Sequence, residues 1–168
     1  MNYFQLFNLP QKFEINIEKL KLQFYKLQKQ YHPDISDNIF ENKNNKYLDK
    51  SISINKGYQT LKDPLKRAEH LLLLNSYDFK KKQKELSENI FLYKQLELYE
   101  KLDKLKKNIK KKLELHNFYN NIKNKKKCYL LELELMLDKK NWKLAATILY
   151  KLFFYKKLEE KLENVENI

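Results

Sequence analysis

A histidine and an aspartate stand two positions apart in the sequence, as His32 and Asp34, with Pro33 between them. An imidazole beside a carboxylate is a common pair in general acid-base catalysis. The sequence supplies no nucleophile, glycine-rich phosphate loop or second carboxylate cluster to work with this pair. We therefore predict no catalytic residue and no enzyme activity. A lone His-Asp pair on a loop is usually plain surface, so its use depends on what positions it.

The segment before His32 predicts an amphipathic helix over Ile17–Tyr31, with Asn16 as its N-cap. Proline cannot continue a helix and pushes the preceding residue out of the α region, so His32 is expected just past the helix end, on a stiff exposed turn. The apolar residues of the helix project within roughly 60° of one another: Leu20, Phe24, Leu27 and Tyr31. The opposite face is basic and carries Lys19, Lys26 and Lys29.

The other patterns before residue 75 also predict helices. A short helix is expected within Tyr3–Leu9, a polar loop over Ile35–Lys46, and a further helix starting at Pro64. Between that loop and Pro64 we expect a helix whose inward side carries Leu48, Ile52, Asn55, Tyr58 and Leu61. The helix after Pro64 is expected to turn Leu65, Ala68, Leu71 and Leu72 inward.

The polar, lysine-rich stretch Asn75–Lys84 is the best candidate for a domain boundary. Beyond it, three long helical patterns predict an antiparallel bundle: Ser87–Lys111, Leu113–Leu137 and Asn141–Leu162, the last capped by Asn141. Leucines alternate with Glu and Met over residues 131–137 as in a strand, but these are good helix formers and none is β-branched, so a helix is favoured. We predict an all-α protein with domains at 1–75 and 85–168 and a linker at 76–84.

The basic helix that runs into His-Pro-Asp resembles the J-domain of co-chaperones. Further motifs narrow the resemblance to the HscB (Hsc20) family of iron-sulfur cluster assembly, and they extend over almost the whole chain: Asn2-Tyr3-Phe4-Gln5-Leu6-Phe7, Leu27-Gln28-Lys29-Gln30-Tyr31-His32-Pro33-Asp34, Asp63-Pro64-Leu65, Arg67-Ala68-Glu69 and Gln95-Leu96-Glu97-Leu98. The resemblance implies that Asp34 pairs with an arginine of an HscA-type, DnaK-like chaperone, that His32 and Pro33 fix its geometry, and that the three lysines meet an acidic patch there. The family commonly has lysine after this turn, and here Ile35 puts one peripheral contact in doubt.

The helix after Ser87 has two apolar arcs. One is a core stripe of Phe91, Leu98, Leu102, Leu105 and Ile109, and the other contains Leu92, Tyr93 and Leu96 with Glu97 and Glu100 at its edge. The second arc suits docking of another protein, or it packs on a neighbouring helix, and periodicity leaves both open. The resemblance favours docking, because the HscB family uses matching positions to hold the scaffold protein IscU: Leu92, Leu96, Glu97, Glu100 and Phe154. Tyr93 stands where the family often has another apolar residue.

The net charge of +13 raises nucleic acid or an acidic protein as partners. Nearly all of the positive charge is lysine, which reads bases less well than arginine, so we predict lysines on solvated faces and no nucleic acid partner.

The histidines and Cys128 share no ligand spacing, so neither metal nor cofactor is expected. No apolar run is long enough to span a bilayer, and a single cysteine forbids an internal disulfide.

The resemblance therefore implies a co-chaperone of iron-sulfur cluster biogenesis, which stimulates the ATPase of an HscA-type chaperone and delivers IscU to it. We expect a bacterial cytoplasmic protein that is monomeric or associates weakly. The nearer alternative is a J-domain protein with another client. The alternative from another class is a basic RNA-binding helical protein, motivated by the charge and the twelve tyrosines.

Overall fold

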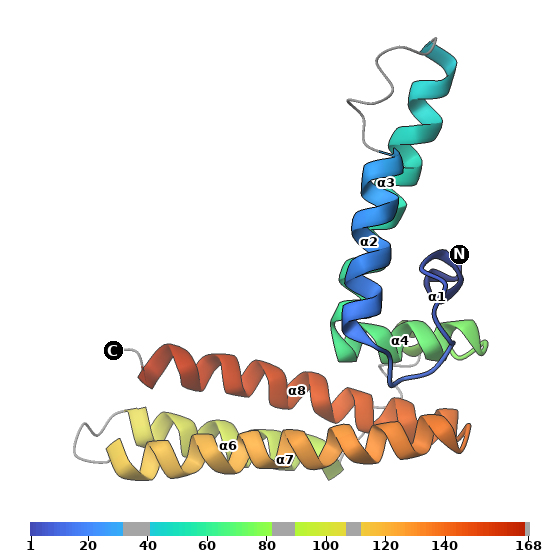
Figure 1. Ribbon diagram of the computed structural model, residues 1–168. Coiled ribbons are helices and arrows are strands. Elements are labelled where there is room, and N and C mark those ends of the chain that lie inside the picture. The colour runs from blue at the N-terminus through green and yellow to red at the C-terminus, as the bar shows by residue number, and fades with distance from the viewer. Residues whose placement is uncertain (32–40, 82–89, 107–111, 167–168) are drawn as a thin grey trace. The chain divides into compact units, whose positions relative to one another are not determined.

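The computed structural model describes residues 1–31, 41–81, 90–106 and 112–166, and these residues form helices and no strand, as predicted. The chain divides into two compact units, residues 1–74 and 75–168. In the first unit α1 (Tyr3–Leu6) and α4 (Pro64–Leu74) pack around a long antiparallel hairpin of α2 (Ile17–Tyr31) and α3 (Glu41–Lys62) (Figure 1). The second unit contains α6 (Ile90–Lys106), α7 (Lys112–Asp138) and α8 (Trp142–Glu166). No described helix is long and apolar enough to cross a membrane.

Capping side chains begin the helices of the first unit where the sequence predicts. The Asn16 side-chain oxygen accepts a hydrogen bond from the Lys19 backbone N–H at 2.9 Å, which confirms the predicted cap of α2. Asp63 accepts from the N–H of Leu65 at 2.8 Å, and Pro64 occupies the first position of α4. Leu20 is fully buried, and the predicted inward side of α4 is buried as well. These caps fix where α2 and α4 start.

The predicted inward face of α3 is right for Leu61 and wrong for Leu48 and Ile52, and it leaves out the buried Ile54. Leu48 and Ile52 are 50% and 55% exposed, whereas Ile54 and Leu61 are fully buried. The buried line passes through Gly57, which gives no apolar signal because it has no side chain. A Cβ added there would lie 2.8 Å from a ring carbon of Tyr3, so the α1 side chains fill the space that a side chain of α3 would otherwise take.

The predicted loop over residues 35–46 is too long, since α3 begins at Glu41. Asparagine is a weak helix former, at up to about 0.7 kcal/mol per residue relative to alanine. Extending an existing helix costs far less than starting one, however, because the nucleus is already formed further along α3. The asparagine-rich stretch therefore joins the helix.

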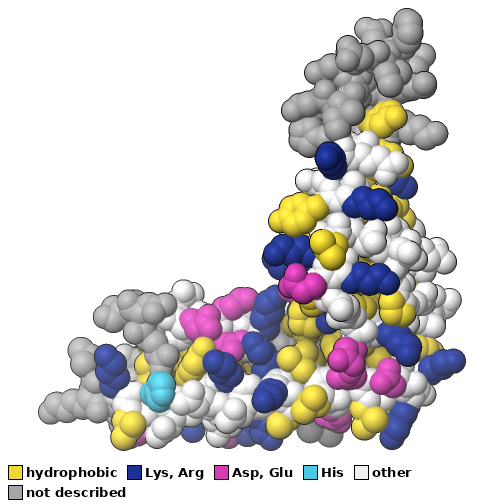
Figure 2. Space-filling model, viewed as in Figure 1, with side chains coloured by type: hydrophobic (Ala, Val, Ile, Leu, Met, Phe, Trp, Pro, Cys, Tyr) yellow, Lys and Arg dark blue, Asp and Glu magenta, His cyan; other side chains and the backbone are white. Residues whose placement is uncertain are grey.

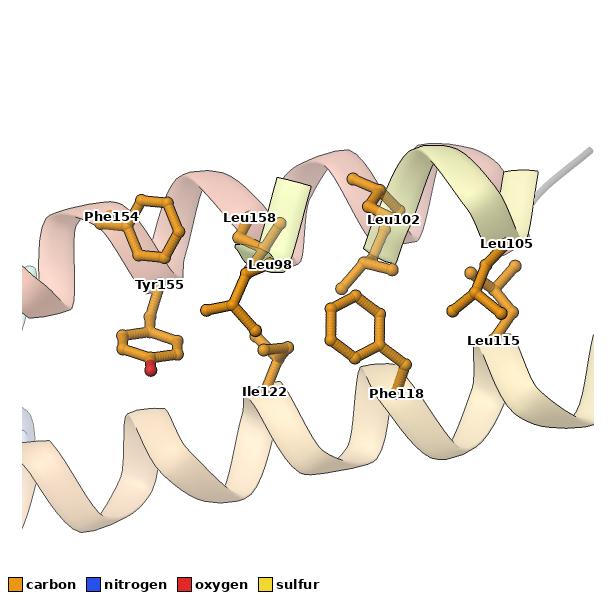
Figure 3. Packing of buried hydrophobic residues seen from close by; sticks show 10 residues of the cluster. Leu98, Leu102, Leu105, Leu115, Phe118, Ile122, Phe154, Tyr155 and Leu158 are labelled. Atoms are coloured by element: carbon orange, nitrogen blue, oxygen red, sulfur yellow. The ribbon is translucent and has the colours of Figure 1, made fainter. Parts of the chain in front are cut away.

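The second unit is a three-helix bundle, as predicted. Leu98, Leu102 and Leu105 of α6 face Leu115, Phe118 and Ile122 of α7 and Leu158 of α8 (Figure 3). The alternating leucines lie on helix α7, and Leu133 and Leu137 are the buried ones. Asn141 caps α8 by accepting from the Leu144 N–H at 3.2 Å, which confirms the predicted cap.

The turn between α7 and α8 closes with a Schellman pattern. The Asn141 N–H donates to the Met136 carbonyl at 2.9 Å and the Lys140 N–H donates to the Leu137 carbonyl at 3.0 Å. Lys140 adopts a left-handed conformation with φ 55°. This conformation is strained for a residue other than glycine, and the turn that it forms lets α8 fold back along α7.

The start of the second unit includes part of the segment assigned to a linker. Phe79 is 4% exposed and stacks on Phe153 of α8 with 5.7 Å between ring centroids. The Asp78 side chain accepts from the Lys81 N–H at 3.2 Å and caps a helical turn that begins at Phe79. This polar stretch is therefore anchored to the bundle by one apolar side chain.

Candidate functional site

The exposed face of α2 is basic. Lys19, Lys26 and Lys29 are all exposed, on the side of the helix opposite the buried Leu20. Figure 2 shows lysines with hydrophobic side chains between them on the hairpin face turned to the viewer. The structure therefore brings the three predicted lysines together on one accessible surface.

Aromatic and amide contacts hold α2 against α3 up to the last residue before the His-Pro-Asp motif. The rings of Phe24 and Tyr58 stack with centroids 4.0 Å apart. The Gln28 amide donates to the Asn55 side-chain oxygen at 2.7 Å, which ties the hairpin on its exposed edge. Tyr31 packs on Tyr47 of α3 at 5.8 Å between centroids. The predicted residues His32, Pro33 and Asp34, and Ile35 after them, lie outside the described residues.

Two apolar side chains on the same face of α2 were missed by the sequence reasoning. Leu22 and Tyr25 are 69% and 59% exposed. At about 100° per residue Leu22 projects between the three lysines, and Tyr25 projects about 40° beyond Lys29. A leucine placed opposite the core stripe of its own helix is a signal that a helical projection reveals. A basic face with apolar groups inside it suits a partner surface that is acidic and partly apolar.

The predicted patch on α6 is also accessible. Leu92 and Leu96, one turn apart, are 48% and 51% exposed, and Tyr93 beside them is 75% exposed. The side chain of Glu97 makes an exposed ion pair with Lys94 at 2.9 Å, and Glu100 is exposed one turn beyond Leu96. We call these five residues of the prediction, Leu92, Tyr93, Leu96, Glu97 and Glu100, the α6 patch. Its apolar centre therefore has a carboxylate border.

Phe154 lies beneath the α6 patch and not on it. It is 7% exposed, and its ring meets those of Phe91 and Tyr99 edge-on at 5.4 and 5.5 Å between centroids. An apolar ring is more stable in this seam between α6 and α8 than in water. With so little exposed area, Phe154 offers a partner little surface and supports the helix that carries the patch, so its direct contact with the scaffold stays a prediction.

Glu97, at the border of the α6 patch, affects the pKa of the buried Tyr155. Burial, the neighbouring Tyr129 and the charge of Glu97 raise the pKa of Tyr155 to about 12. The Tyr155 hydroxyl therefore stays protonated throughout the physiological range.

Asp103 of α6, which the sequence reasoning missed, is exposed and projects within about 20° of Leu92, so it extends the acidic border of the α6 patch by one turn.

The other polar side chains that were considered as metal ligands do not gather. His70 is 7% exposed, its Nε2 accepts a hydrogen bond from the Tyr3 N–H at 3.2 Å, and burial lowers its pKa below the ordinary 6.5. Cys128 is exposed on α7. Within the described residues no three His, Cys, Asp or Glu side chains are arranged to hold a metal ion.

Comparison with known proteins gives the same division of the chain. Residues 2–70 match the family model described as DnaJ domain, and residues 87–163 match the one described as HSCB C-terminal oligomerisation domain. The chain is 44% identical over 168 residues to the co-chaperone protein HscB of Buchnera aphidicola subsp. Acyrthosiphon pisum, which covers 100% of this chain and 97% of that protein. It is 36% identical over 166 residues to the co-chaperone protein HscB homolog of Aliivibrio fischeri, with 99% and 97% covered.

Solved structures share the fold. The chaperone HscB from Vibrio cholerae superimposes with a TM-score of 0.93 at 37% identity, covering 99% of this chain and 98% of that one. Human co-chaperone protein HscB superimposes with a TM-score of 0.86 at 23% identity, covering 98% and 81%, and supports the fold alone.

Proposed function

The chain belongs to the HscB family of J-domain co-chaperones, and from this premise we propose that it couples an HscA-type, DnaK-like chaperone to an IscU-type iron-sulfur scaffold. In this proposal the first unit stimulates ATP hydrolysis by the chaperone, and the second unit carries the scaffold. The protein itself performs no catalysis. We also propose that it acts in the cytoplasm of a bacterium, since its curated relatives are bacterial co-chaperones.

The observation that carries the proposal is the exposed basic face of α2, which leads directly into His32, Pro33 and Asp34. Exposed lysines of this kind mainly speed the encounter between the two proteins and add little to affinity, because salt screens exposed charges. Asp34 supplies a carboxylate that an arginine can grip with two hydrogen bonds, which is the stronger and more specific contact. Leu22 and Tyr25 add apolar area between the charges.

The first test is the ATPase rate of the chaperone with and without this protein. His32→Gln should abolish the stimulation, and Lys26→Gln should weaken it and make it less sensitive to salt. Lys56→Gln is the matched control, since Lys56 is also an exposed lysine and lies on α3. Full stimulation by His32→Gln would remove the chaperone half of the proposal.

The α6 patch is the proposed scaffold site because it combines exposed apolar area with a carboxylate border. Leu92 and Leu96 supply the apolar centre, and interface centres of this kind carry most of the binding energy. Glu97 already pairs with Lys94 on its own helix and can exchange that exposed, weak ion pair for a basic group of the scaffold.

The second test is scaffold affinity by titration calorimetry. Replacing both Leu92 and Leu96 with alanine should weaken binding by at least tenfold, from about 1 kcal/mol or more for each hot-spot leucine. The matched control replaces Leu131 and Leu135, two leucines of α7 with the same spacing and similar exposure. Undiminished affinity of the α6 variant would defeat the scaffold half, while ATPase stimulation tests the other half independently.

Having both sites on one chain explains why the two units are joined. A scaffold held by the second unit reaches the chaperone at the effective concentration set by the connection, not at its concentration in solution. We therefore expect the scaffold to be transferred to the chaperone more efficiently by the intact chain than by a mixture in which the two sites lie on different molecules. Mixing a His32→Gln variant with a Leu92→Ala, Leu96→Ala variant tests this with full-length chains.

A further inference from the structure

Two large apolar side chains of α3 lie exposed. Leu48 and Ile52 are 50% and 55% exposed and stand one helical turn apart. At about 100° per residue, each projects at least about 120° from the buried Ile54, Gly57 and Leu61 of the same helix. The core of the first unit therefore does not require an apolar residue at either position. We call Leu48 and Ile52 the α3 pair.

The helix face around the α3 pair is uncharged. Asn55 and Gln59 are also exposed, and at about 100° per residue they project with the pair inside an arc of about 60°. The charged residues between positions 48 and 59 project outside this arc, and the nearest of them are Asp49 and Lys56, on the side of α3 turned away from α2. A partner that covers the arc buries no charged group, which keeps the cost of removing water low.

The α3 pair lies on the same side of the helical hairpin as Tyr25 of α2. The two helices run side by side (Figure 1), and the hydrogen bond of 2.7 Å from Gln28 to Asn55 joins them along one exposed edge. On α2, Tyr25 projects about 60° beyond Gln28, away from α3. On α3, the pair projects about 20° and 60° beyond Asn55, away from α2. Tyr25 and the α3 pair therefore border this hydrogen bond from its two sides.

The α3 pair also lies at the end of the hairpin where α2 leads into the His-Pro-Asp motif. Tyr31, the last residue of α2, packs on Tyr47, which directly precedes Leu48 in the sequence. Lys50, which lies between the two members of the pair in the sequence, is 6.0 Å from the centroid of the Tyr31 ring. A partner that contacts both Tyr25 and the residues after Tyr31 is therefore brought next to the α3 pair.

We propose that the α3 pair is an apolar anchor for the DnaK-like chaperone, which would then contact both helices of the hairpin. This inference rests on the proposed function, since it assigns a further part of the surface to the same partner. Lysines attract a partner from a distance and are screened by salt, whereas apolar side chains act only on contact and gain by losing water. The lysines of α2 therefore govern how fast the complex forms, and the α3 pair governs how long it lasts.

Titration of the chaperone ATPase with this protein tests the anchor. Leu48→Gln with Ile52→Gln should raise the half-saturating concentration by at least about fivefold, as expected for loss of an anchoring contact. Stimulation at saturation should be retained, because the His-Pro-Asp motif is unchanged. Glutamine is a good helix former, so α3 should persist, and circular dichroism checks this. Leu73→Gln is the matched control, since Leu73 of α4 is 56% exposed, and it should leave the half-saturating concentration unchanged.

Salt separates the anchor from the lysines. The defect of the Leu48→Gln, Ile52→Gln variant should persist when the salt concentration is raised, whereas the defect of Lys26→Gln should shrink. A wild-type half-saturating concentration in the α3 variant, or loss of scaffold affinity in its place, overturns the inference and leaves the proposed role of α2 intact. A wild-type protein that does not stimulate the chaperone removes both.

Cross-linking tests proximity without relying on affinity. In a Cys128→Ser background, a benzophenone attached to Leu48→Cys should cross-link several-fold more chaperone than one attached to Asp49→Cys. Asp49 is also exposed but projects about 100° from Leu48, on the side of α3 turned away from α2. Equal yields at the two positions would show that the chaperone does not approach the uncharged face of α3 in preference to its neighbour, and the anchor would be refuted.

Discussion

Replacing Phe154 with alanine should destabilise the bundle, and any loss of scaffold binding should follow from that. The ring is 7% exposed, so truncation removes on the order of 100 Å² of buried apolar surface, or about 2.5 kcal/mol. The edge-on contacts with Phe91 and Tyr99 add roughly 1–2 kcal/mol. The sum of about 4 kcal/mol lies within the range of about 3–5 kcal/mol measured for truncation of buried phenylalanine.

Urea unfolding followed by circular dichroism measures this loss, and calorimetry measures scaffold affinity on the same samples. Leu92→Ala provides the contrast, because Leu92 is 48% exposed and its removal should lower the free energy of unfolding by less than about 1 kcal/mol while still weakening the scaffold complex. A Phe154→Ala protein of unchanged stability that fails to bind the scaffold would refute the reasoning, since the ring would then act as a direct contact.

Three further changes test the packing. Gly57→Ala should lower the stability of the first unit by about 1–2 kcal/mol in denaturant, because the new methyl group would sit 2.8 Å from a ring carbon of Tyr3; a stabilised variant would contradict the close approach. Burial holds the pKa of His70 below 6.5, so as the pH drops this histidine is protonated in the unfolded chain before it is protonated in the folded one. The free energy of unfolding should therefore fall as the pH drops below about 6.5. Thermal unfolding at pH 7.5 and 5.5 measures this fall, and His70→Gln should make it smaller. Lys140→Gly should raise the stability of the bundle by about 1 kcal/mol, because glycine adopts φ 55° without strain; an unchanged unfolding midpoint would argue against this turn.

The sequence predicts the helices well where apolar side chains alone define the pattern. The periodicity of α2 identifies its buried side correctly, and the caps at Asn16 and Asn141 begin helices where expected. On α3 the prediction is right for Leu61 but misses Gly57, which Tyr3 of α1 packs closely and which has no side chain to indicate burial. Leu48 and Ile52 then give a competing stripe that faces outward.

The sequence also predicted some residues of the candidate sites better than others. Periodicity alone could not decide whether the second arc of α6 faces a partner or a neighbouring helix, because an apolar arc is expected in either case. The exposure of Leu92 and Leu96 shows that the bundle leaves this arc uncovered. Phe154 could not be separated from it by sequence, since an aromatic residue on α8 fits a surface contact and a core seam equally well.

The charge and the tyrosines that motivated an RNA-binding alternative have structural uses in the described residues. Arg67, the single arginine, is buried, donates to the Leu61 carbonyl at 2.6 Å and lies over the Phe13 ring. It is therefore not displayed as a phosphate-binding fork. Lysines likewise cover aromatic faces of the bundle, as Lys161 does at 4.4 Å from the Tyr99 centroid.

Ten of the twelve tyrosines are buried or partly buried, and two, Tyr25 and Tyr93, are exposed. Bases need accessible rings in series to stack on, and these two lie on different units. Each belongs instead to one of the two proposed protein-binding surfaces, Tyr25 within the basic face of α2 and Tyr93 within the acid-bordered α6 patch. Exposed aromatic side chains of this kind are enriched where proteins bind proteins, so the two tyrosines that the fold leaves uncovered favour a chain with two protein partners.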